Sequence, residues 1–166
     1  MKITKEQLYV GAAVMQIAEH DKFTAINALQ LKESPRGNSF LINDKTPLFC
    51  KYASSKNSYN EYQFNFTTDQ FDSFKETMQK YGAFYIALIC VEDSEICCLS
   101  FKELKDLIQF RNRSSKSTQD QYVILAQLEK RKSFRAYVHA AGHKGFYAGE
   151  QLIVSRADFP SKIFER

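Results

Sequence analysis

Apolar residues recur at helical spacing in three segments of the chain. Residues 4–22 open with the capping-box pattern Thr4-x-x-Gln7 and carry apolar residues around much of the helix circumference, which predicts a well-buried helix. Residues 67–82 carry apolar side chains at helical spacing and end on a glycine, as a second helix would. Ser100 opens another capping box and predicts a third, short helix.

Strand-like patterns fill most of the remaining chain. Residues 39–52 predict a hairpin around an Asn-Asp turn, and in residues 62–66 aromatic and amide side chains alternate with the period of a half-buried strand. Residues 83–91 are continuously apolar, which predicts a central strand covered on both faces. Further strands are expected at residues 24–31, 95–99, 122–128, 134–140 and 152–154.

This order of elements predicts a mixed α/β fold. A central mixed sheet, partly antiparallel, should carry helices on its faces, and the C-terminal part should be rich in strands. The 166 residues, 44% of them hydrophobic, are enough for one packed core, and the chain has no long linker or internal repeat. We therefore expect a single domain over residues 1–166, with a polar, basic loop at 111–119 and an apolar C-terminal tail packed on the body.

The cysteines and the lengths of the apolar runs bear on where in the cell the protein is expected. Cys50, Cys90, Cys97 and Cys98 each lie in an apolar stretch, as buried reduced thiols do, and their spacing does not match paired zinc ligands. The longest apolar run is about half the length of a membrane span. The first residues lack the apolar core of a signal peptide. These features favour a cytoplasmic protein with no membrane partner.

Positive charge is concentrated in the C-terminal part of the chain. The net charge is +4, but residues 1–100 carry 10 basic and 12 acidic side chains, whereas residues 101–166 carry 13 basic and 7 acidic ones. The candidate nucleic-acid-binding residues there are Arg111, Arg113, Lys116, Lys130, Arg131, Lys132 and Arg135. Aromatic side chains lie between them and could stack on a base, so DNA or RNA is a candidate partner. The alternative is a solvated loop and hairpin tip whose charge serves solubility.

Strong catalytic signatures are missing from the sequence. It contains no glycine-rich phosphate loop, no G-x-S-x-G nucleophile elbow and no H-E-x-x-H zinc motif. His139 and His143 are four residues apart, a spacing that suits a metal on a helix, whereas the surrounding pattern is that of a strand and a turn. We therefore expect no metal site there, and we expect Cys50 to be a core residue rather than a nucleophile paired with His20 or His139.

One arrangement in the N-terminal part points to a known fold. Lys51 follows an apolar strand, and Glu19 ends the apolar face of the first helix. The order of a helix with a glutamate, a hairpin ending in a lysine, a helix and a further strand resembles the PD-(D/E)XK (restriction-endonuclease-like) nuclease superfamily over roughly residues 4–100. In that superfamily the hairpin bears an acid followed by an acid-x-Lys triplet. The resemblance implies a nuclease-like core with Glu19, Asp44 and Lys51 as candidate catalytic residues.

The carboxylates of the resembled motif are missing. The triplet falls on Phe49-Cys50-Lys51, so a phenylalanine stands where a metal-binding acid is expected, and no acid lies near Asn38 or Ser39, where the preceding acid belongs. Asp44 is close in sequence but has the context of a turn residue. Hydrolysis of a phosphodiester needs clustered carboxylates to hold Mg²⁺, which a lysine alone cannot do. The resemblance therefore implies a catalytically degenerate copy, and the alternative is that Lys51 is an ordinary strand-end lysine.

Two non-enzymatic functions fit these observations. The first is a nucleic-acid-associated protein on a degenerate nuclease-like scaffold, which binds phosphates through the C-terminal basic residues, with Lys51 lining the former cleft. The second is a protein-interaction module, such as an immunity or regulatory partner, with Tyr59, Tyr62 and Tyr147 among its interface anchors. In neither case is a cofactor expected.

A third hypothesis keeps catalysis. In a Mg²⁺-dependent nuclease, Glu19, Asp44 and Glu61 would have to replace the missing acids and lie together near Lys51. This hypothesis ranks below the other two because the metal-binding carboxylates of the resembled motif are missing.

Overall fold

The computed structural model describes residues 1–114, 121–140 and 143–165. The helices in these ranges are α1 (Lys5–Ala18), α2 (Thr68–Tyr81) and α3 (Phe101–Arg113). Each begins at a capping box, in which the hydroxyl of Thr4, Thr67 or Ser100 accepts a hydrogen bond from the backbone N–H three residues later. The side chain at that later position accepts from the cap residue's own N–H, so two otherwise unpaired donors are satisfied at each helix start.

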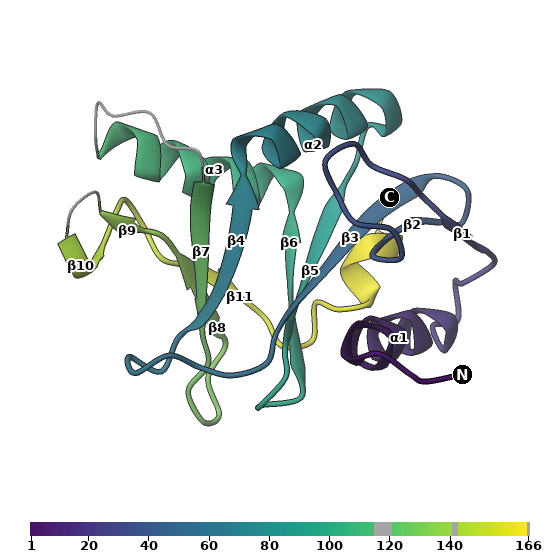
Figure 1. The fold of residues 1–166 in the computed structure, drawn as a ribbon, viewed down its shortest axis with the longest axis horizontal. Coiled ribbons are helices and arrows are strands. Elements are labelled where there is room, and N and C mark those ends of the chain that lie inside the picture. Colours follow the sequence, from purple (N-terminus) through teal and green to yellow (C-terminus); the bar gives the residue numbers. More distant parts are fainter. Residues whose placement is uncertain (115–120, 141–142, 166) are drawn as a thin grey trace.

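A five-stranded sheet forms the right-hand half of the molecule in Figure 1. Its strands, in order across the sheet, are β1 (Ile26–Ala28), β2 (Ser39–Ile42), β3 (Thr46–Ala53), β5 (Tyr85–Cys90) and β6 (Glu95–Ser100). β5 runs parallel to β3, and the other neighbouring strands are antiparallel. β5 is therefore an internal strand, and nearly all of its side chains are buried, as its continuous apolar run predicted.

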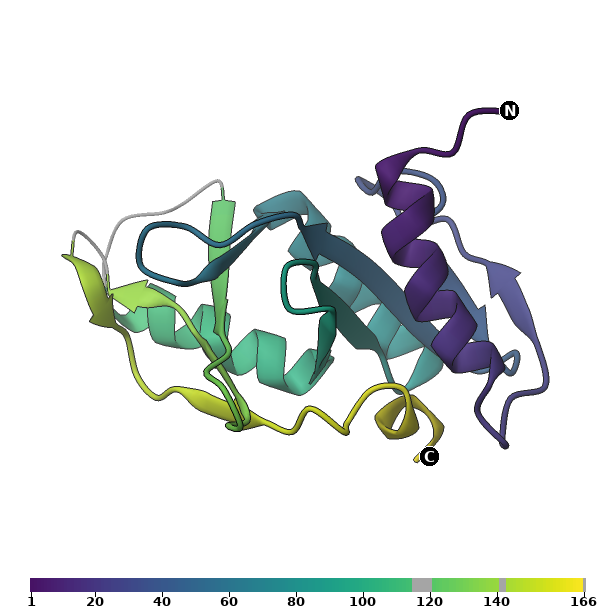
Figure 2. The ribbon, with the colours of Figure 1, turned by 90° about the horizontal axis from the view of Figure 1, so that it is seen from below.

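A four-stranded antiparallel sheet forms the left-hand half. Its strands, in order, are β11 (Leu152–Val154), β8 (Phe134–Tyr137), β7 (Gln121–Gln127) and β4 (Tyr62–Thr67). β9 (His139–Ala140) and β10 (His143–Tyr147) form a separate two-stranded ribbon, and the 3₁₀ helix η1 (Ser161–Phe164) ends the described chain. α2 and α3 lie above the strands in Figure 1, whereas Figure 2 shows α1 on the side of the five-stranded sheet that is remote from the other sheet.

Two apolar cores lie on opposite faces of the five-stranded sheet. The larger core lies between the two sheets and includes the rings of Phe49, Phe66 and Phe74, whose centroids are 5.0 to 6.1 Å apart. The smaller core lies between α1 and the other face of the sheet, and residues of η1 complete it. This packing confirms the predicted C-terminal tail on the body. The four cysteines are free and buried, also as predicted.

The mixed α/β class, the hairpin and the central strand are confirmed, but several boundaries differ from the predictions. The strand expected at residues 134–140 is divided into β8, which belongs to the four-stranded sheet, and β9, which pairs with β10. The strand expected at residues 24–31 extends only over Ile26–Ala28, and the hydrogen bond from the N–H of Leu29 to the carbonyl of Ser39 ends its contact with β2. α1 ends at Ala18 instead of residue 22, since the next residues turn back on the helix. Arg111–Arg113, predicted as a loop, form the last turn of α3, where positive side chains oppose the negative end of the helix dipole.

α1 is also less buried than its sequence predicted. Only Val10, Ala13 and Ile17 are buried, whereas the side chains of Leu8 and Met15 are 54% and 60% exposed. A helix lying on a sheet can bury one stripe of its surface, and this sequence carries a second apolar stripe that is turned away from the sheet. Within the described ranges, no helix has the length and apolar character needed to cross a membrane.

Candidate nucleic-acid interface

Lys51 lies on the face of β3 that is turned toward the four-stranded sheet. It shares that face with Phe49, and its Nζ atom is 5.2 Å from the centroid of the Phe66 ring on β4. The side chain is partly buried, and this burial lowers the pKa of its ammonium group, although the carboxylate of Glu6 acts in the opposite direction. Lys51 is therefore held between the sheets, packed on an aromatic ring.

The other two candidate catalytic residues lie elsewhere. Glu19 is the exposed C-cap of α1. It lies 13 residues, or about 20 Å along the helix axis, beyond Glu6, the carboxylate that acts on Lys51. Asp44 occupies the β2–β3 turn with a positive φ of 59° and accepts a hydrogen bond of 2.8 Å from the side chain of Asn27. Among the described residues, no three His, Cys, Asp or Glu side chains are grouped so that they could hold a metal ion. The structure therefore does not bring Glu19, Asp44 and Lys51 together.

The positions of the missing acids are neighbours in space. Ser39 of β2 pairs directly with Phe49 of β3, and the N–H of Cys50 donates to the carbonyl of Asn38 at 2.8 Å. Asn38, Ser39 and Phe49 are all buried. The first position where the resembled motif would carry a carboxylate thus holds an amide or hydroxyl side chain, and the second holds a phenyl ring. Both positions lie in a closed interior rather than in a cleft.

An open cavity of about 890 Å³ lies at the opposite end of β7 from α3. The β7–β8 turn, the loop before β4 and the segment after β11 form its walls. Its basic lining residues are Lys56, Lys130, Arg131, Lys132 and Arg156, and its acidic ones are Asp93 and Glu129. Three of the seven residues predicted from the C-terminal basic cluster therefore line one cavity, joined by two basic residues from distant parts of the chain.

Three of the five positive charges in this cavity are neutralised locally. Lys56 lies 3.4 Å from Asp93, Lys132 pairs with Glu129, and Arg156 is held by a carboxylate of β6. The ammonium of Lys132 lowers the pKa of the exposed Glu129 carboxyl. Lys130 and Arg131 are exposed, and no described residue forms an ion pair with either of them. These two side chains carry the charge that an anionic ligand would meet.

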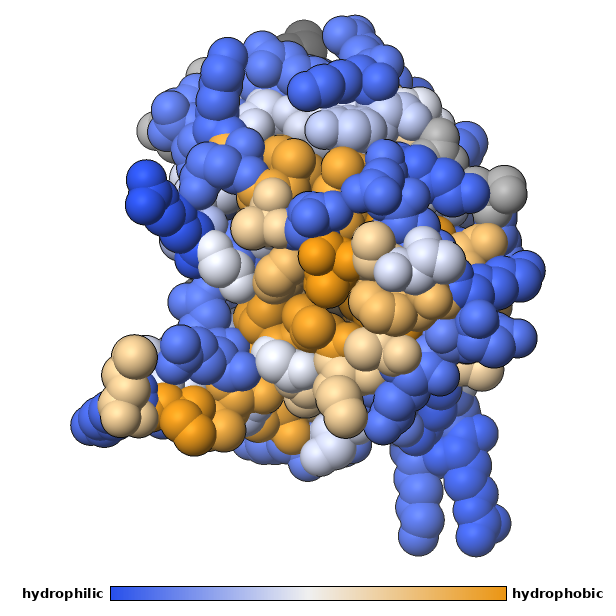
Figure 3. Space-filling view, turned by 90° about the vertical axis from the view of Figure 1, so that its right-hand side faces the viewer, coloured by the Kyte–Doolittle hydropathy of each residue, from blue (hydrophilic) through white to orange (hydrophobic). Residues whose placement is uncertain are grey.

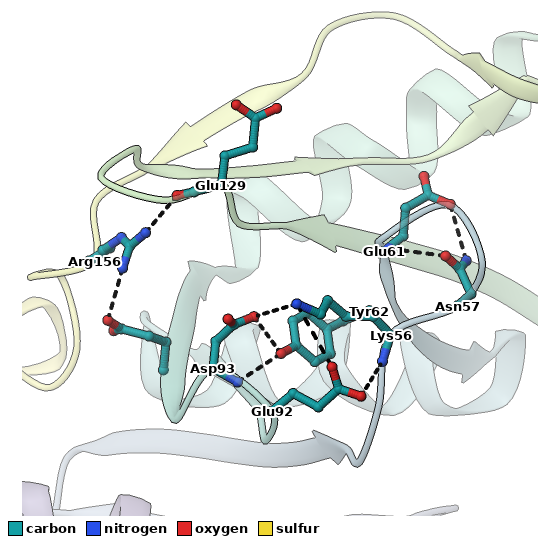
Figure 4. A network of polar contacts seen from close by, with 9 residues as sticks. Lys56, Asn57, Glu61, Tyr62, Glu92, Asp93, Glu129 and Arg156 are labelled. Atoms are coloured by element: carbon teal, nitrogen blue, oxygen red, sulfur yellow. Dashed lines mark hydrogen bonds and ion pairs between the residues drawn. The ribbon is translucent and has the colours of Figure 1, made fainter.

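Arg156 fixes the shape of the β7–β8 turn. Its Nε and Nη2 atoms donate to the backbone carbonyls of Lys132 and Glu129, both at 2.7 Å, and its Nη1 atom donates to Glu95 at 3.2 Å. Figure 4 shows the contact between Arg156 and Glu129. Arg131, at the tip of the turn, has a left-handed backbone with a φ of 62°. A planar guanidinium with donors in a fixed fork is suited to this task, because it can reach several carbonyls at once.

Lys56 is held by a second network on the opposite wall. Its Nζ atom also lies 3.8 Å from Glu92, and the hydroxyl of Tyr62 donates to Asp93 at 2.6 Å (Figure 4). Lys56 and Arg156 are not among the residues predicted from the sequence. Neither belongs to a basic run, and only the packing of distant segments places them at the cavity, so no local signal could have identified them.

The remaining members of the predicted basic set do not line this cavity. Arg135 lines a smaller adjoining pocket of about 130 Å³. Arg111 and Arg113 lie beyond the other end of β7, which spans seven residues or about 23 Å. Lys116 lies outside the described residues. The predicted patch is therefore divided between two ends of the four-stranded sheet, because β7 separates the two basic segments.

Glu61 serves as a buried anchor for the loop before β4. Its carboxylate is 5% exposed, accepts a hydrogen bond from the hydroxyl of Tyr137, and lies 3.1 Å from the amide of Asn57 and 3.4 Å from Nε2 of His139. Burial raises the pKa of the Tyr137 phenol, and the hydrogen bond to Glu61 adds to this effect. Glu61 is thus engaged on the four-stranded sheet, on a different element from Glu19 and Asp44.

Two further expectations can be compared with the structure. Cys50 is a core residue, as predicted, and burial raises the pKa of its thiol, which disfavours the nucleophilic thiolate. The prediction that Tyr62 is an interface anchor is wrong, because this side chain is fully buried with its hydroxyl bonded to Asp93. Tyr59 and Tyr147 are exposed, by 60% and 52%. The side chain of His143 lies outside the described set.

Comparison of the chain with protein-family models, curated proteins and solved structures gives no match. The assignment of a function therefore rests on the residues and their geometry.

Proposed function

We propose that this protein binds nucleic acid without cleaving it, through the basic cavity at the β7–β8 turn. The observation that carries the proposal is the exposure of Lys130 and Arg131 on a turn that Arg156 holds in one shape. Phosphate oxygens are bound by lysine and arginine side chains that are positioned in advance and still have free donors. At this turn Arg156 holds the backbone in place, and the exposed side chains of Lys130 and Arg131 can reach a phosphate.

The geometry around Lys51 supports the non-catalytic part of the proposal. The element order on which the nuclease resemblance rests is present, with α1, the β2–β3 hairpin, α2 and β5 in sequence. At the hairpin, Phe49 takes the place of a carboxylate and lies beneath Phe66 and Phe74. A site that binds Mg²⁺ requires oxygen ligands in a space open to the substrate, and this position offers neither.

The expected affinity is modest and depends on salt. Lys130, Arg131 and the nearby Arg135 give about three phosphate contacts, so log K should fall with log salt with a slope of about −2.7 on duplex DNA. This slope corresponds to a loss of about 40-fold in affinity between about 50 and 200 mM salt.

Fluorescence anisotropy with labelled duplex and single-stranded DNA and RNA, in the presence of Mg²⁺, tests the proposal. The double variant Lys130→Ala/Arg131→Ala should weaken binding and reduce the slope by about 1.8, because two phosphate contacts are lost. The matched control Lys22→Ala/Lys105→Ala removes the same charge from two exposed positions off the cavity and should leave the slope close to that of the native chain. Absence of binding at low salt, or an equal effect of both variants, would contradict the proposal.

A protein-interaction module is the second candidate. The observation that favours it is the apolar patch on the face of the molecule that carries α1, which is surrounded by hydrophilic residues (Figure 3). Patches of this kind on a surface mark contacts with other proteins. If the anisotropy experiment detects no binding to any nucleic acid, this candidate becomes the leading one.

A further inference from the structure

The outward stripe of α1 is apolar along most of its length. Leu8, Gly11, Ala12 and Met15 are all exposed, at spacings that place them on one face of the helix, opposite the buried residues that pack on the sheet. The side chains of Leu8 and Met15 are 54% and 60% exposed. Figure 3 shows the apolar patch on this side of the molecule. Exposed apolar residues gathered on one helix face, rather than scattered singly, are typical of an interface.

Charged residues end this stripe, with opposite signs at its two ends. Lys5 is the first residue of α1, and Glu19 is its C-cap; both are exposed. In the described part of the chain, no ion pair or side-chain hydrogen bond engages either of them. Each charge opposes the dipole of its own helix, whose N-terminus favours acidic and whose C-terminus favours basic side chains. Both charges would be favourable beside a helix that runs in the opposite direction.

Apart from the signs of its two end charges, the stripe has the same order of charged and apolar residues in both directions. Lys5, Leu8, Ala12, Met15 and Glu19 follow one another at spacings of 3, 4, 3 and 4, which is the seam of a coiled coil. About Ala12 as centre, a large apolar residue lies on each side and a charge lies at each end. Two copies packed antiparallel around a two-fold axis at Ala12 would place Lys5 of one copy against Glu19 of the other, and Leu8 against Met15. A parallel arrangement would place like charges together.

The middle of the stripe allows two helices to approach closely. A Cβ atom added at Gly11 would have no atom within 4 Å, so the space above this position is open, and Ala12 is small. Small residues at the crossing point, with larger ones on each side, suit the interaxial distance of about 8 Å at the short end of helix packing. An adjacent groove of about 420 Å³, lined by Val14 and Phe40 among others, adds apolar surface to this face.

We propose that α1 forms the interface of a symmetric, antiparallel dimer of this chain, with Ala12 at the two-fold axis. Such an interface is isologous, because the same stripe meets itself and satisfies its own charges. One helix pair of this length, about 21 Å, lies at the small end of specific interfaces, so the dimer should dissociate in the micromolar range. The proposal is independent of nucleic-acid binding, since its residues do not line the basic cavity.

Sedimentation velocity over a range of protein concentrations tests the dimer. The native chain should shift from monomer to dimer as concentration rises, and Ala12→Arg should remain monomeric because a long charged side chain blocks the crossing point. Ala12 is exposed, so this variant should keep the native circular dichroism spectrum and melting temperature. Gln79→Arg, on the exposed side of α2, is the matched control and should dimerise like the native chain.

A charge exchange tests the antiparallel arrangement. Lys5→Glu alone and Glu19→Lys alone each create two repulsive pairs across the axis, and each should raise the dimer Kd roughly threefold to tenfold. The double variant Lys5→Glu/Glu19→Lys restores opposite charges across the axis and should recover the native Kd. Single and double variants with the same Kd would overturn the arrangement.

Two other outcomes would overturn the proposal itself. A native chain that stays monomeric at every concentration would exclude a second copy as the occupant of this face. A dimer that survives Ala12→Arg would have to use another surface. If the chain is monomeric and a foreign protein binds the native chain but not Ala12→Arg, the face belongs to that protein instead.

Discussion

The region around Lys51 and the β7–β8 turn both place a basic residue beside an apolar strand, yet they differ in what surrounds the charge. Lys51 is packed between two sheets on the ring of Phe66, and burial lowers the pKa of its ammonium. Lys130 and Arg131 project from a turn that a third basic residue holds by its backbone. The first region uses its lysine for packing, whereas the second leaves its charge free for a ligand.

The surroundings of a basic residue therefore decide what its charge can do. A charge buried beside an aromatic ring loses hydration, and a contact of that kind offsets part of the loss. A charge on a supported turn keeps its hydration until a phosphate replaces the water. The motif position at Lys51 would therefore need an open cleft and acidic neighbours before it could act on a phosphodiester. Three changes test this comparison, and the largest effect is expected in the inter-sheet core.

Phe49→Asp should destabilise the protein most. The substitution restores the carboxylate of the resembled motif, but it removes a buried phenyl ring and introduces a charge among Phe66 and Phe74. The loss of the ring alone costs about 3–5 kcal/mol, and the buried carboxylate adds to that cost. We expect the variant to unfold at room temperature, as measured by urea denaturation and circular dichroism.

Phe49→Leu is the control for this change, because it keeps an apolar side chain and should cost about 1–2 kcal/mol. If Phe49→Asp instead folds with native stability and gains Mg²⁺-dependent nuclease activity, the position is a cleft and not a core, and the comparison fails.

Arg156→Ala should have a smaller effect, which lowers both the free energy of unfolding and the affinity for nucleic acid. The variant loses three hydrogen bonds, two of them to the backbone of the β7–β8 turn. Because the side chain is partly exposed, we expect a loss of about 1–2 kcal/mol in the free energy of unfolding. The loosened turn should also weaken nucleic-acid binding, although the charges of Lys130 and Arg131 remain. Urea denaturation and anisotropy on the same samples measure both effects.

Arg156→Lys separates the two roles of Arg156. It keeps the positive charge but cannot reach two carbonyls and a carboxylate in one plane. Binding that is restored by lysine would show that the charge of residue 156 matters, and not its support of the turn.

Much of the fold could be predicted from local patterns, because local rules govern those parts. The capping boxes at Thr4 and Ser100 marked two of the helix starts, and the continuous apolar run of residues 83–91 identified the internal strand. The number of sheets was not predictable in this way. Two strands with alternating patterns can join one sheet or two, and only their long-range pairing, such as β4 with β7, decides between these arrangements.

The candidate site was predictable only in part for the same reason. Lys130, Arg131 and Lys132 are consecutive, so composition alone identified them. Lys56 lies 74 residues before Lys130, and Arg156 lies 24 residues after Lys132. Only the packing of the chain places these two residues at the cavity. The exposed stripe of α1 was visible as apolar residues at helical spacing, but the sequence could not show which of two apolar stripes faces the sheet.

The smallest effect is expected at two half-buried lysines whose pKa values are shifted in opposite directions. Lys162 lies 2.7 Å from Glu103, and although burial alone would lower the pKa of its ammonium, this ion pair raises it above the ordinary value. Burial lowers the pKa of Lys51. At alkaline pH below the ordinary pKa of lysine, the unfolded chain therefore binds the proton of Lys51 more tightly than the folded chain does. The contribution of Lys51 to the free energy of unfolding consequently rises with pH. The contribution of Lys162 is present below its ordinary pKa and is lost as pH rises through the higher folded value.

Lys51→Met and Lys162→Met, unfolded by urea at neutral and alkaline pH, measure this contrast. At neutral pH, Lys162→Met should cost about 1 kcal/mol because it leaves Glu103 without its partner. Lys51→Met should change stability by less than that, since methionine fills similar space and the cation–π contact offsets part of the cost of burying the charge. As pH rises, the native chain should gain stability relative to Lys51→Met and lose it relative to Lys162→Met. Equal slopes for the two variants would mean that Lys51 is solvated in the folded protein, and the contrast between a packed lysine and a free one would no longer hold.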